Sequence, residues 1–212
     1  MSLLCAEYDP ARPHGHVTWR VHRGLPVVEI VNNWVCATFE DTYRPPLIAN
    51  RLTHALRALQ PEVLHLHNLL NLSFDLPAMA HAQGVPVVAT LHDYTLVCPS
   101  GGQRVHRAEQ FVCERIDTER CVRCLRDSPI HTQMSLGTLA AAAHVPRPVQ
   151  RAVLTLGRRL PRLAAIVGQA AGRVSATGIT KQDIDARMAA ARRVFDNIDL
   201  FVAPSPSMTA SI

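Results

Sequence analysis

The chain has 212 residues, of which 48% are hydrophobic and 18% charged, and its net charge is +5 with histidine neutral. This length suffices for one domain with a substantial core, and the composition excludes a disordered or fibrous chain. No apolar run reaches the roughly 20 residues that span a bilayer. The N-terminal MSLLCAEYDP lacks a basic stretch followed by an apolar one. We therefore expect no signal peptide and a cytoplasmic protein.

The first half of the chain alternates between short apolar runs and helical patterns. LPVVEIV, residues 25–31, predicts a strand, and apolar residues at helical spacing predict a helix over 45–60. EVLHLHN then predicts a strand that ends near Asn68. The next helix, in SFDLPAMAHAQG, is expected to be capped by Ser73 and stopped by Gly84.

A further strand is predicted in VPVVATLH, which is apolar nearly throughout. Such continuous runs are typical of strands covered on both faces. Strands that alternate with helices imply right-handed crossovers and a parallel sheet. The sequence therefore predicts an α/β fold.

The second half has a different character. Residues 98–126 have no strong period and are interpreted as a cysteine-bearing loop, whereas residues 130–196 look mostly helical. Thr180 and Asp183 resemble a capping box at the start of one helix, and a last strand is predicted over 199–204. We expect a single domain over the whole chain.

Polar residues follow three of the predicted strands. They are His67-Asn68, His92-Asp93 and Pro204-Ser205. In an open α/β sheet, ligands bind outside the carboxyl ends of the strands, so these exits are the candidate site. A structural role for each histidine stays open, and adjacent residues such as His92 and Asp93 point opposite ways, so a dyad between them is not implied.

Four stretches, taken in order, carry a resemblance to a known family. PEVLHLHNLLNLS, GVPVVATLHDYTLVCPSGG, the downstream C…CVRC and NIDLFVAPSPSM resemble the N-terminal domain of family-4-type glycosyltransferases. These are retaining enzymes with two Rossmann domains, the GT-B fold, and the resemblance covers roughly residues 17–212. It implies a Rossmann-like parallel sheet flanked by helices.

The resemblance also implies a function. Such enzymes transfer a hexosyl group from a nucleotide-sugar to a glycan or lipid-linked acceptor, as in polysaccharide biosynthesis, without a required catalytic metal. The acceptor lies mainly on the N-terminal domain. Mapped onto this chain, His92 is the cleft residue nearest the transferred sugar and the candidate catalytic residue. The substrate-binding candidates around it are Asn68, His67, Asp93, Tyr94 and Ser205.

The chain also departs from the family pattern. It begins at what resembles the second strand of the domain, without the first strand and its Gly-rich loop, and the C-terminal donor domain is not recognisable. We therefore expect a partial domain, truncated at both ends and inactive alone. The alternative is a non-catalytic zinc-stapled module that binds a sugar or a protein, or a remnant of such an enzyme.

Four cysteines gather after the His92 exit. Cys98, Cys113, Cys121 and Cys124 are separated by 14, 7 and 2 residues, and the last spacing is common in structural zinc sites. We expect a closed four-thiolate zinc site; disulfides and unlinked thiols remain alternatives, although cytosolic redox conditions weigh against disulfides. The remaining two cysteines, Cys5 and Cys36, are interpreted as small core residues.

A basic amphipathic pattern follows the cysteines. The arginines of this pattern lie opposite an apolar face, which suits peripheral contact with the inner face of a membrane; an ordinary surface helix is the alternative. A nucleic-acid-binding zinc protein is not expected, because aromatic residues are few. The arginines are Arg147, Arg151, Arg158 and Arg162.

Overall fold

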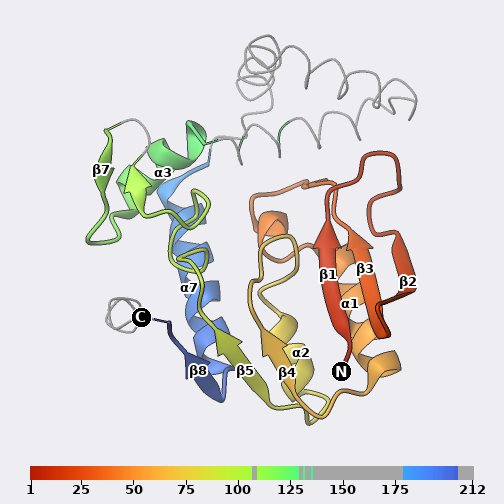
Figure 1. Cartoon of the computed structure of the whole chain (residues 1–212). Coiled ribbons are helices and arrows are strands. Elements are labelled where there is room, and N and C mark those ends of the chain that lie inside the picture. Colours follow the sequence, from red (N-terminus) through yellow and green to blue (C-terminus); the bar gives the residue numbers. More distant parts are fainter. Residues whose placement is uncertain (107–108, 129–130, 132–134, 136–178, 205–212) are drawn as a thin grey trace.

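The structure is a computed structural model that describes residues 1–106, 109–128, 131, 135 and 179–204 (Figure 1). Its first sheet has the strand order β1-β3-β2, made by β1 (Leu3–Glu7), β3 (Leu25–Val31) and β2 (Val17–His22). β1 runs parallel to β3, and β2 runs antiparallel to it. A two-residue turn joins β2 to β3, and its Arg23 and Gly24 have φ values of 51° and 81°. Two positive φ angles are typical of the tight hairpin turns that match strand twist.

The second sheet carries the parallel strands that the sequence predicts. β4 (Leu64–Leu66), β5 (Val87–Thr90) and β8 (Leu200–Val202) lie in the order β4-β5-β8, and both pairings are parallel. Parallel strands end at the same edge of a sheet. The chain exits after β4 and β5 are therefore neighbours.

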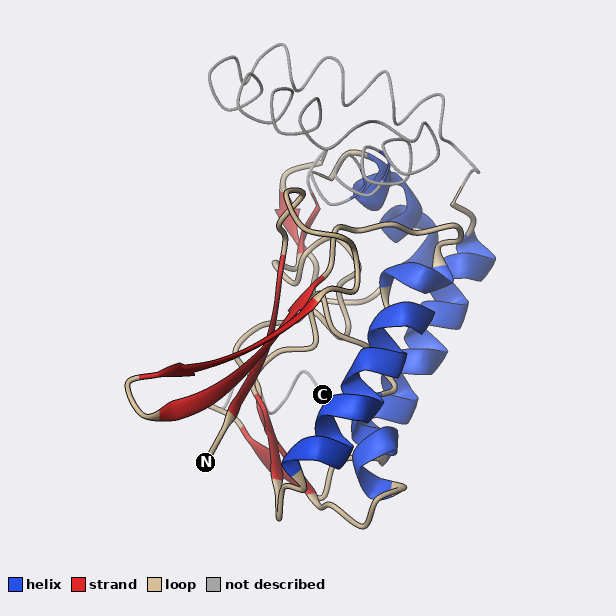
Figure 2. Ribbon diagram, turned by 90° about the vertical axis from the view of Figure 1, so that its right-hand side faces the viewer, coloured by secondary structure: helices blue, strands red, loops and turns tan. Residues whose placement is uncertain are grey.

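Three helices lie on one face of the strands (Figure 2). They are α1 (Pro46–Leu59), α2 (Leu76–His81) and α7 (Lys181–Asp196). The α/β prediction is confirmed, with a parallel sheet flanked by helices. In the part of the chain that the structure describes, however, no helix covers the opposite face of β4 and β5. The prediction of strands covered on both faces is wrong for those residues, and the uncovered face is where the polar side chains gather.

Local signals explain where these helices begin and end. α1 starts with Pro46 at its first position and ends at Gln60, whose φ of 43° is left-handed. The predicted cap of α2 is wrong: Asp75 is its N-cap residue, and the Ser73 hydroxyl instead accepts the Asp75 N–H at 3.2 Å, in the turn before the helix. Gly84 does not end α2 directly but closes the following turn, at a φ of 73°.

α7 begins as predicted, at a capping box. The Thr180 hydroxyl accepts the Asp183 N–H, and the Asp183 carboxylate accepts the Thr180 N–H at 2.8 Å. These two bonds satisfy backbone donors that a helix start otherwise leaves without partners.

One hydrophobic core contains side chains from both sheets and from the three helices. Ile30 of β3, Leu52 of α1, Val87 of β5 and Val194 of α7 all belong to it and are almost completely buried. Near this core, the buried Asn32 donates its amide to the Asn71 carbonyl at 2.9 Å and so links the end of β3 to the loop after β4. The two sheets therefore form one unit.

The predicted cysteine loop contains regular structure. It holds the hairpin of β6 (Val105–His106) and β7 (Phe111–Val112), followed by α3 (Thr118–Arg126). Each strand has two residues and α3 has nine, so none is long enough to give a clear period. A short 3₁₀ helix, η1 (Glu40–Thr42), precedes α1.

Several predicted features lie outside the described residues. These are Ser205, much of the helical stretch predicted over 130–196, and the arginines of the basic amphipathic pattern. The last strand, predicted over 199–204, is β8. Among the helices that the structure describes, none has the length and apolarity to cross a membrane.

Candidate functional site

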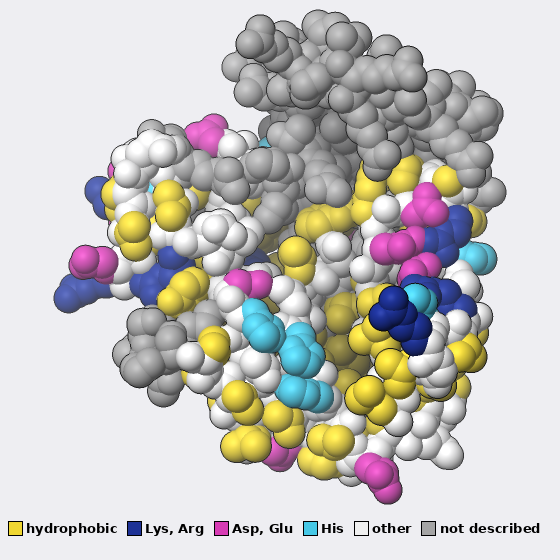
Figure 3. Space-filling view, in the orientation of Figure 1, with side chains coloured by type: hydrophobic (Ala, Val, Ile, Leu, Met, Phe, Trp, Pro, Cys, Tyr) yellow, Lys and Arg dark blue, Asp and Glu magenta, His cyan; other side chains and the backbone are white. Residues whose placement is uncertain are grey.

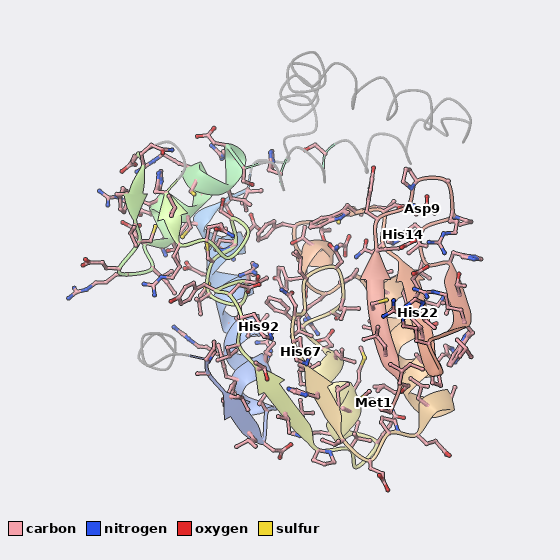
Figure 4. All side chains as sticks on the ribbon, viewed as in Figure 1. Met1, Asp9, His14, His22, His67 and His92 are labelled. Atoms are coloured by element: carbon pink, nitrogen blue, oxygen red, sulfur yellow. The ribbon has the colours of Figure 1, made fainter. Side chains whose placement is uncertain are left out.

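The two predicted histidine exits meet in the structure. His67 directly follows β4, and His92 lies two residues beyond β5. Their ring nitrogens, Nδ1 of His67 and Nε2 of His92, are 2.8 Å apart, and the rings stack with centroids 5.1 Å apart (Figure 4). This distance is a hydrogen bond, so one ring donates and the other accepts.

A third histidine joins this pair. His65 of β4 stacks on His67 with ring centroids 4.3 Å apart, and its Nε2 is 2.8 Å from the hydroxyl of Thr90. The sequence analysis missed both residues, although the alternation Leu64-His65-Leu66-His67 predicts two histidines on one face of a strand. All three histidines are exposed, and Figure 3 shows a row of histidine side chains on this face.

Asn68 and Asp93 make a second contact between the two exits. The Asn68 amide donates to Oδ2 of Asp93 at 2.7 Å, and Oδ1 of Asp93 accepts the Thr95 N–H, also at 2.7 Å. Oδ1 of Asn68 in turn accepts the Leu70 N–H. Both side chains are thus hydrogen-bonded within the protein, and they hold together the loops that follow β4 and β5.

The charge state of the histidine pair follows from its surroundings. Desolvation lowers the pKa of His67, and the nearby charges of His65 and His92 lower it further. A neutral imidazole has one donor and one acceptor nitrogen, which a hydrogen-bonded pair of histidines needs. At neutral pH, His67 is therefore held in its neutral form.

A cavity of about 50 Å³ lies beside the histidines. Its wall combines the polar exits of β4 and β5 with apolar side chains from the end of α7. This mixture is typical of ligand sites, in which a few polar groups orient a molecule against an apolar surface. The lining includes His67, Asn68, His92, Asp93, Val194 and Phe195.

Tyr94 connects this site to the cysteine region. The Arg104 guanidinium lies 5.1 Å from the centre of the Tyr94 ring. The Tyr94 carbonyl accepts the Cys98 N–H at 2.7 Å. Gly102 allows the return of the chain: its φ is 74°, and a Cβ there would lie 2.8 Å from the Thr95 nitrogen. Only glycine fits this close approach without strain.

Arg187 fastens the same loop from α7. This buried side chain donates to the carbonyls of Thr95 at 2.6 Å and Leu96 at 3.0 Å. Its guanidinium also lies 5.0 Å from the ring centre of Phe74. Burial lowers the pKa of Arg187 to about 10, so it stays charged at neutral pH. The sequence analysis missed this residue, because an arginine on an amphipathic helix is ordinarily exposed.

A second cavity is lined by all four clustered cysteines, Cys98, Cys113, Cys121 and Cys124. Burial raises the pKa of Cys121 to about 12, and the charges of the other three thiolates, Cys98, Cys113 and Cys124, raise it too. No disulfide joins any of the six cysteines, all of which are described. Across the described ranges, no three His, Cys, Asp or Glu side chains are already arranged to hold a metal ion.

The two remaining cysteines lie elsewhere and are half-buried. Cys5 is in β1, and burial raises the pKa of its thiol. Cys36 follows β3, and burial raises its pKa to about 12. Neither residue belongs to the buried core, so their interpretation as core residues is wrong, although raised pKa values do not favour reactive thiols either.

Comparison with known families identifies the chain. The family model described as Glycosyltransferase Family 4 matches residues 1–125, which is more than half of the 212 residues. The chain therefore belongs to Glycosyltransferase Family 4. The match includes both histidine exits and all four clustered cysteines; the final motif, NIDLFVAPSPSM, lies beyond it. Neither curated proteins nor solved structures gave a match.

Proposed function

We propose that this domain is the acceptor-side half of a retaining glycosyltransferase, which transfers a hexosyl group from a nucleotide-sugar to a glycan or lipid-linked acceptor. Family membership supports a glycosyltransferase-related role and a glycan-type acceptor. The observation that carries the proposal is the His67–His92 pair, which borders a cavity at the joint carboxyl ends of β4 and β5. Donor binding is assigned to a second domain, and residues 1–212 alone are expected not to catalyse transfer.

The geometry supports a specific role for His92. Its Nε2 is occupied by His67, so we assign its Nδ1 to a hydroxyl group of the sugar. The hydrogen bond between the two rings couples their tautomers and holds the orientation of the His92 ring. His67 is thus a positioning residue, and Asn68 and Asp93 support it by holding the two exit loops in register.

The site is also compatible with sugar binding without transfer. Both carboxylate oxygens of Asp93 already accept hydrogen bonds from the protein, from Asn68 and Thr95. A carboxylate engaged in this way is better suited to holding a loop than to accepting a substrate proton. The second candidate function is therefore a sugar-binding module that uses the same histidines.

Acceptor binding tests the site first. Saturation-transfer NMR against a panel of oligosaccharides should detect a bound glycan, and His92→Ala should weaken its affinity about tenfold, the effect of one lost hydrogen bond to a partly desolvated group. His67→Ala should weaken it less, because Nδ1 of His92 remains. His22→Ala is the matched control, since His22 lies on β2 away from the pair (Figure 4).

Transfer is then measured with a donor-binding domain of the same family supplied by fusion or co-expression. Loss of a preorganised hydrogen bond that acts in the transition state typically lowers the rate by about 10²-fold or more, and we expect this for His92→Ala. Glycan binding without transfer would favour the binding module. Unchanged binding and unchanged transfer in His92→Ala would remove His92 from the site.

A further inference from the structure

We propose that Cys98, Cys113, Cys121 and Cys124 bind one structural zinc ion, which joins the loop after β5 to the β6–β7 hairpin and α3. This inference is independent of the proposed transfer reaction. Four thiolates complete a tetrahedral zinc site and leave no open position for a substrate. The ion would therefore stabilise the fold beside the candidate site and take no part in the chemistry.

The first support is the placement of the four cysteines around one space. Cys121 and Cys124 are three residues apart on α3 and therefore share a helix face. Cys98 comes from the loop after β5, and Cys113 directly follows β7. All four line a single cavity of about 50 Å³, whereas about 10–15 Å³ of such space already accommodates a water molecule. The space between the four thiols is therefore large enough for an ion.

The second support is the backbone around the cavity, which presents the thiols from anchored positions. The Cys113 N–H donates to the Arg104 carbonyl at 2.7 Å, and the Arg104 side chain donates back to the Cys113 carbonyl at 2.9 Å. The Cys98 N–H donates to the Tyr94 carbonyl. α3 is held by its N-cap, because the Asp117 carboxylate accepts the N–H groups of Glu119 and Arg120, each at 3.1 Å.

The third support is charge. Four thiolates around one Zn²⁺ leave a net charge of −2, which needs nearby cations in a partly buried site. Two arginines supply them: the charge of Arg187 interacts with Cys98 and Cys121, and the charge of Arg104 interacts with Cys113. The His106 N–H also hydrogen-bonds the Cys113 sulfur, as outer-shell groups of metal sites do.

Binding requires the thiols to converge. In the described parts of the chain, no three metal-ligating side chains converge on a common point. Zinc–sulfur bonds are about 2.3 Å long, so the four sulfur atoms must move closer together to bind one ion. The required movement is one of side-chain rotation about anchored backbone. The hairpin and α3 contribute only a few residues to the core, so metal binding would add stability that their own packing lacks.

Zinc content of the full chain tests the proposal. Protein purified under reducing conditions should carry about one zinc per chain by elemental analysis, as the closed four-thiolate stoichiometry demands. Serine substitution at Cys98, Cys113, Cys121 or Cys124 should lower this content at least tenfold under mild chelation. The matched controls are Cys5→Ser and Cys36→Ser, which should keep the full content because these thiols lie outside the cavity.

A second measurement keeps the test valid if a serine variant fails to fold. Cobalt(II) exchanged into the wild-type chain should give intense thiolate-to-metal charge-transfer absorption, which only sulfur ligands produce. Substoichiometric zinc with six reactive thiols would overturn the proposal. So would intact-mass loss of two hydrogens per disulfide, or equal loss of zinc from the Cys5→Ser and Cys36→Ser controls. None of these readouts depends on glycosyl transfer.

Discussion

The side chain of Arg187 shows how a single residue can set the shape of the candidate site. It reaches from α7 to the carbonyls of Thr95 and Leu96, in the loop that follows the His92 exit. Its charge is costly to bury, as its lowered pKa indicates, but two short hydrogen bonds and the rings of Tyr43 and Phe74 offset that cost. Hydrogen bonds from charged donors are stronger than neutral ones.

Replacing this arginine should therefore destabilise the fold. Arg187→Met keeps the apolar stem but leaves two buried carbonyls without a donor, and we expect a loss of about 1–3 kcal/mol in the free energy of unfolding. Urea denaturation followed by circular dichroism measures it. Arg192→Met, an exposed position on the same helix, should change stability by less than about 0.5 kcal/mol. Equal values for the two variants would contradict the role given to Arg187.

At the scale of elements, α7 and the strand after it hold the second sheet together. α7 carries Arg187, and the turn after it leads to Asp199, whose carboxylate accepts the Val87 N–H at 2.7 Å and contacts Nε2 of His81 at 2.8 Å. These contacts bind β8 to β5 and α2, although the residues of β8 are themselves exposed. The position of β8 therefore depends on its pairing with β5 and on the contacts of Asp199 more than on burial of its own side chains.

The start of α7 is accordingly a sensitive point. Thr180→Ala removes the hydroxyl of the capping box, and we expect a loss of about 0.5–2 kcal/mol in the free energy of unfolding, the usual range for an N-cap. Thr180→Ser, which keeps the hydroxyl, should retain most of the stability. Thermal and urea denaturation of the three proteins provide the comparison; if serine and alanine cost the same, the cap does not contribute.

At the scale of the whole molecule, histidines with lowered pKa values make stability depend on pH. Burial lowers the pKa of His14, and its Nδ1 accepts the Asn33 N–H at 3.2 Å, which requires the neutral ring. The pKa values of His67 and His131 are lowered as well. The unfolded chain, with histidine pKa values near 6.5, thus binds more protons than the folded chain as the pH falls. Stability is complete above about pH 6.5 and decreases below it.

The His14 contribution can be isolated. His14→Asn replaces the ring with an amide whose oxygen can still accept the Asn33 N–H but does not titrate. We expect the decrease in unfolding free energy between about pH 7.5 and 5.5 to be smaller in His14→Asn than in the wild type. His22→Asn, at an exposed position on β2, should keep the wild-type pH dependence. The same slope in all three proteins would exclude His14 as a source.

The sequence predicts those helices and strands in which the spacing of apolar residues repeats over several turns or residues. α1 and α7 each bury one face of a regular helical spacing, and β5 is part of a continuous apolar run. β2 is mostly exposed and lacks an apolar signal, and the β6–β7 hairpin and α3 are too short for one. Such elements owe their form to neighbours and turns, which a single sequence does not reveal.

The candidate site was predictable in location but not in detail. The rule that ligands bind at strand exits brings attention to His67 and His92, and the structure places these two in contact. The partners that define their environment come from elsewhere: His65 through strand alternation, Thr90 through the register of β4 with β5, and Arg187 through tertiary packing. Only the first of these leaves a trace in the local sequence.

The Arg187 contacts also impose an order on how the chain can assemble during its synthesis. Arg187 and Thr95, which hydrogen-bond each other, are 92 positions apart in the sequence. At translation rates of about 5–20 residues per second, the loop after β5 waits roughly 5–20 s for the helix that holds it. During that interval the histidine exits and the cysteines emerge without their anchor. A nascent chain of this protein therefore exposes its four clustered cysteines before the fold can enclose them.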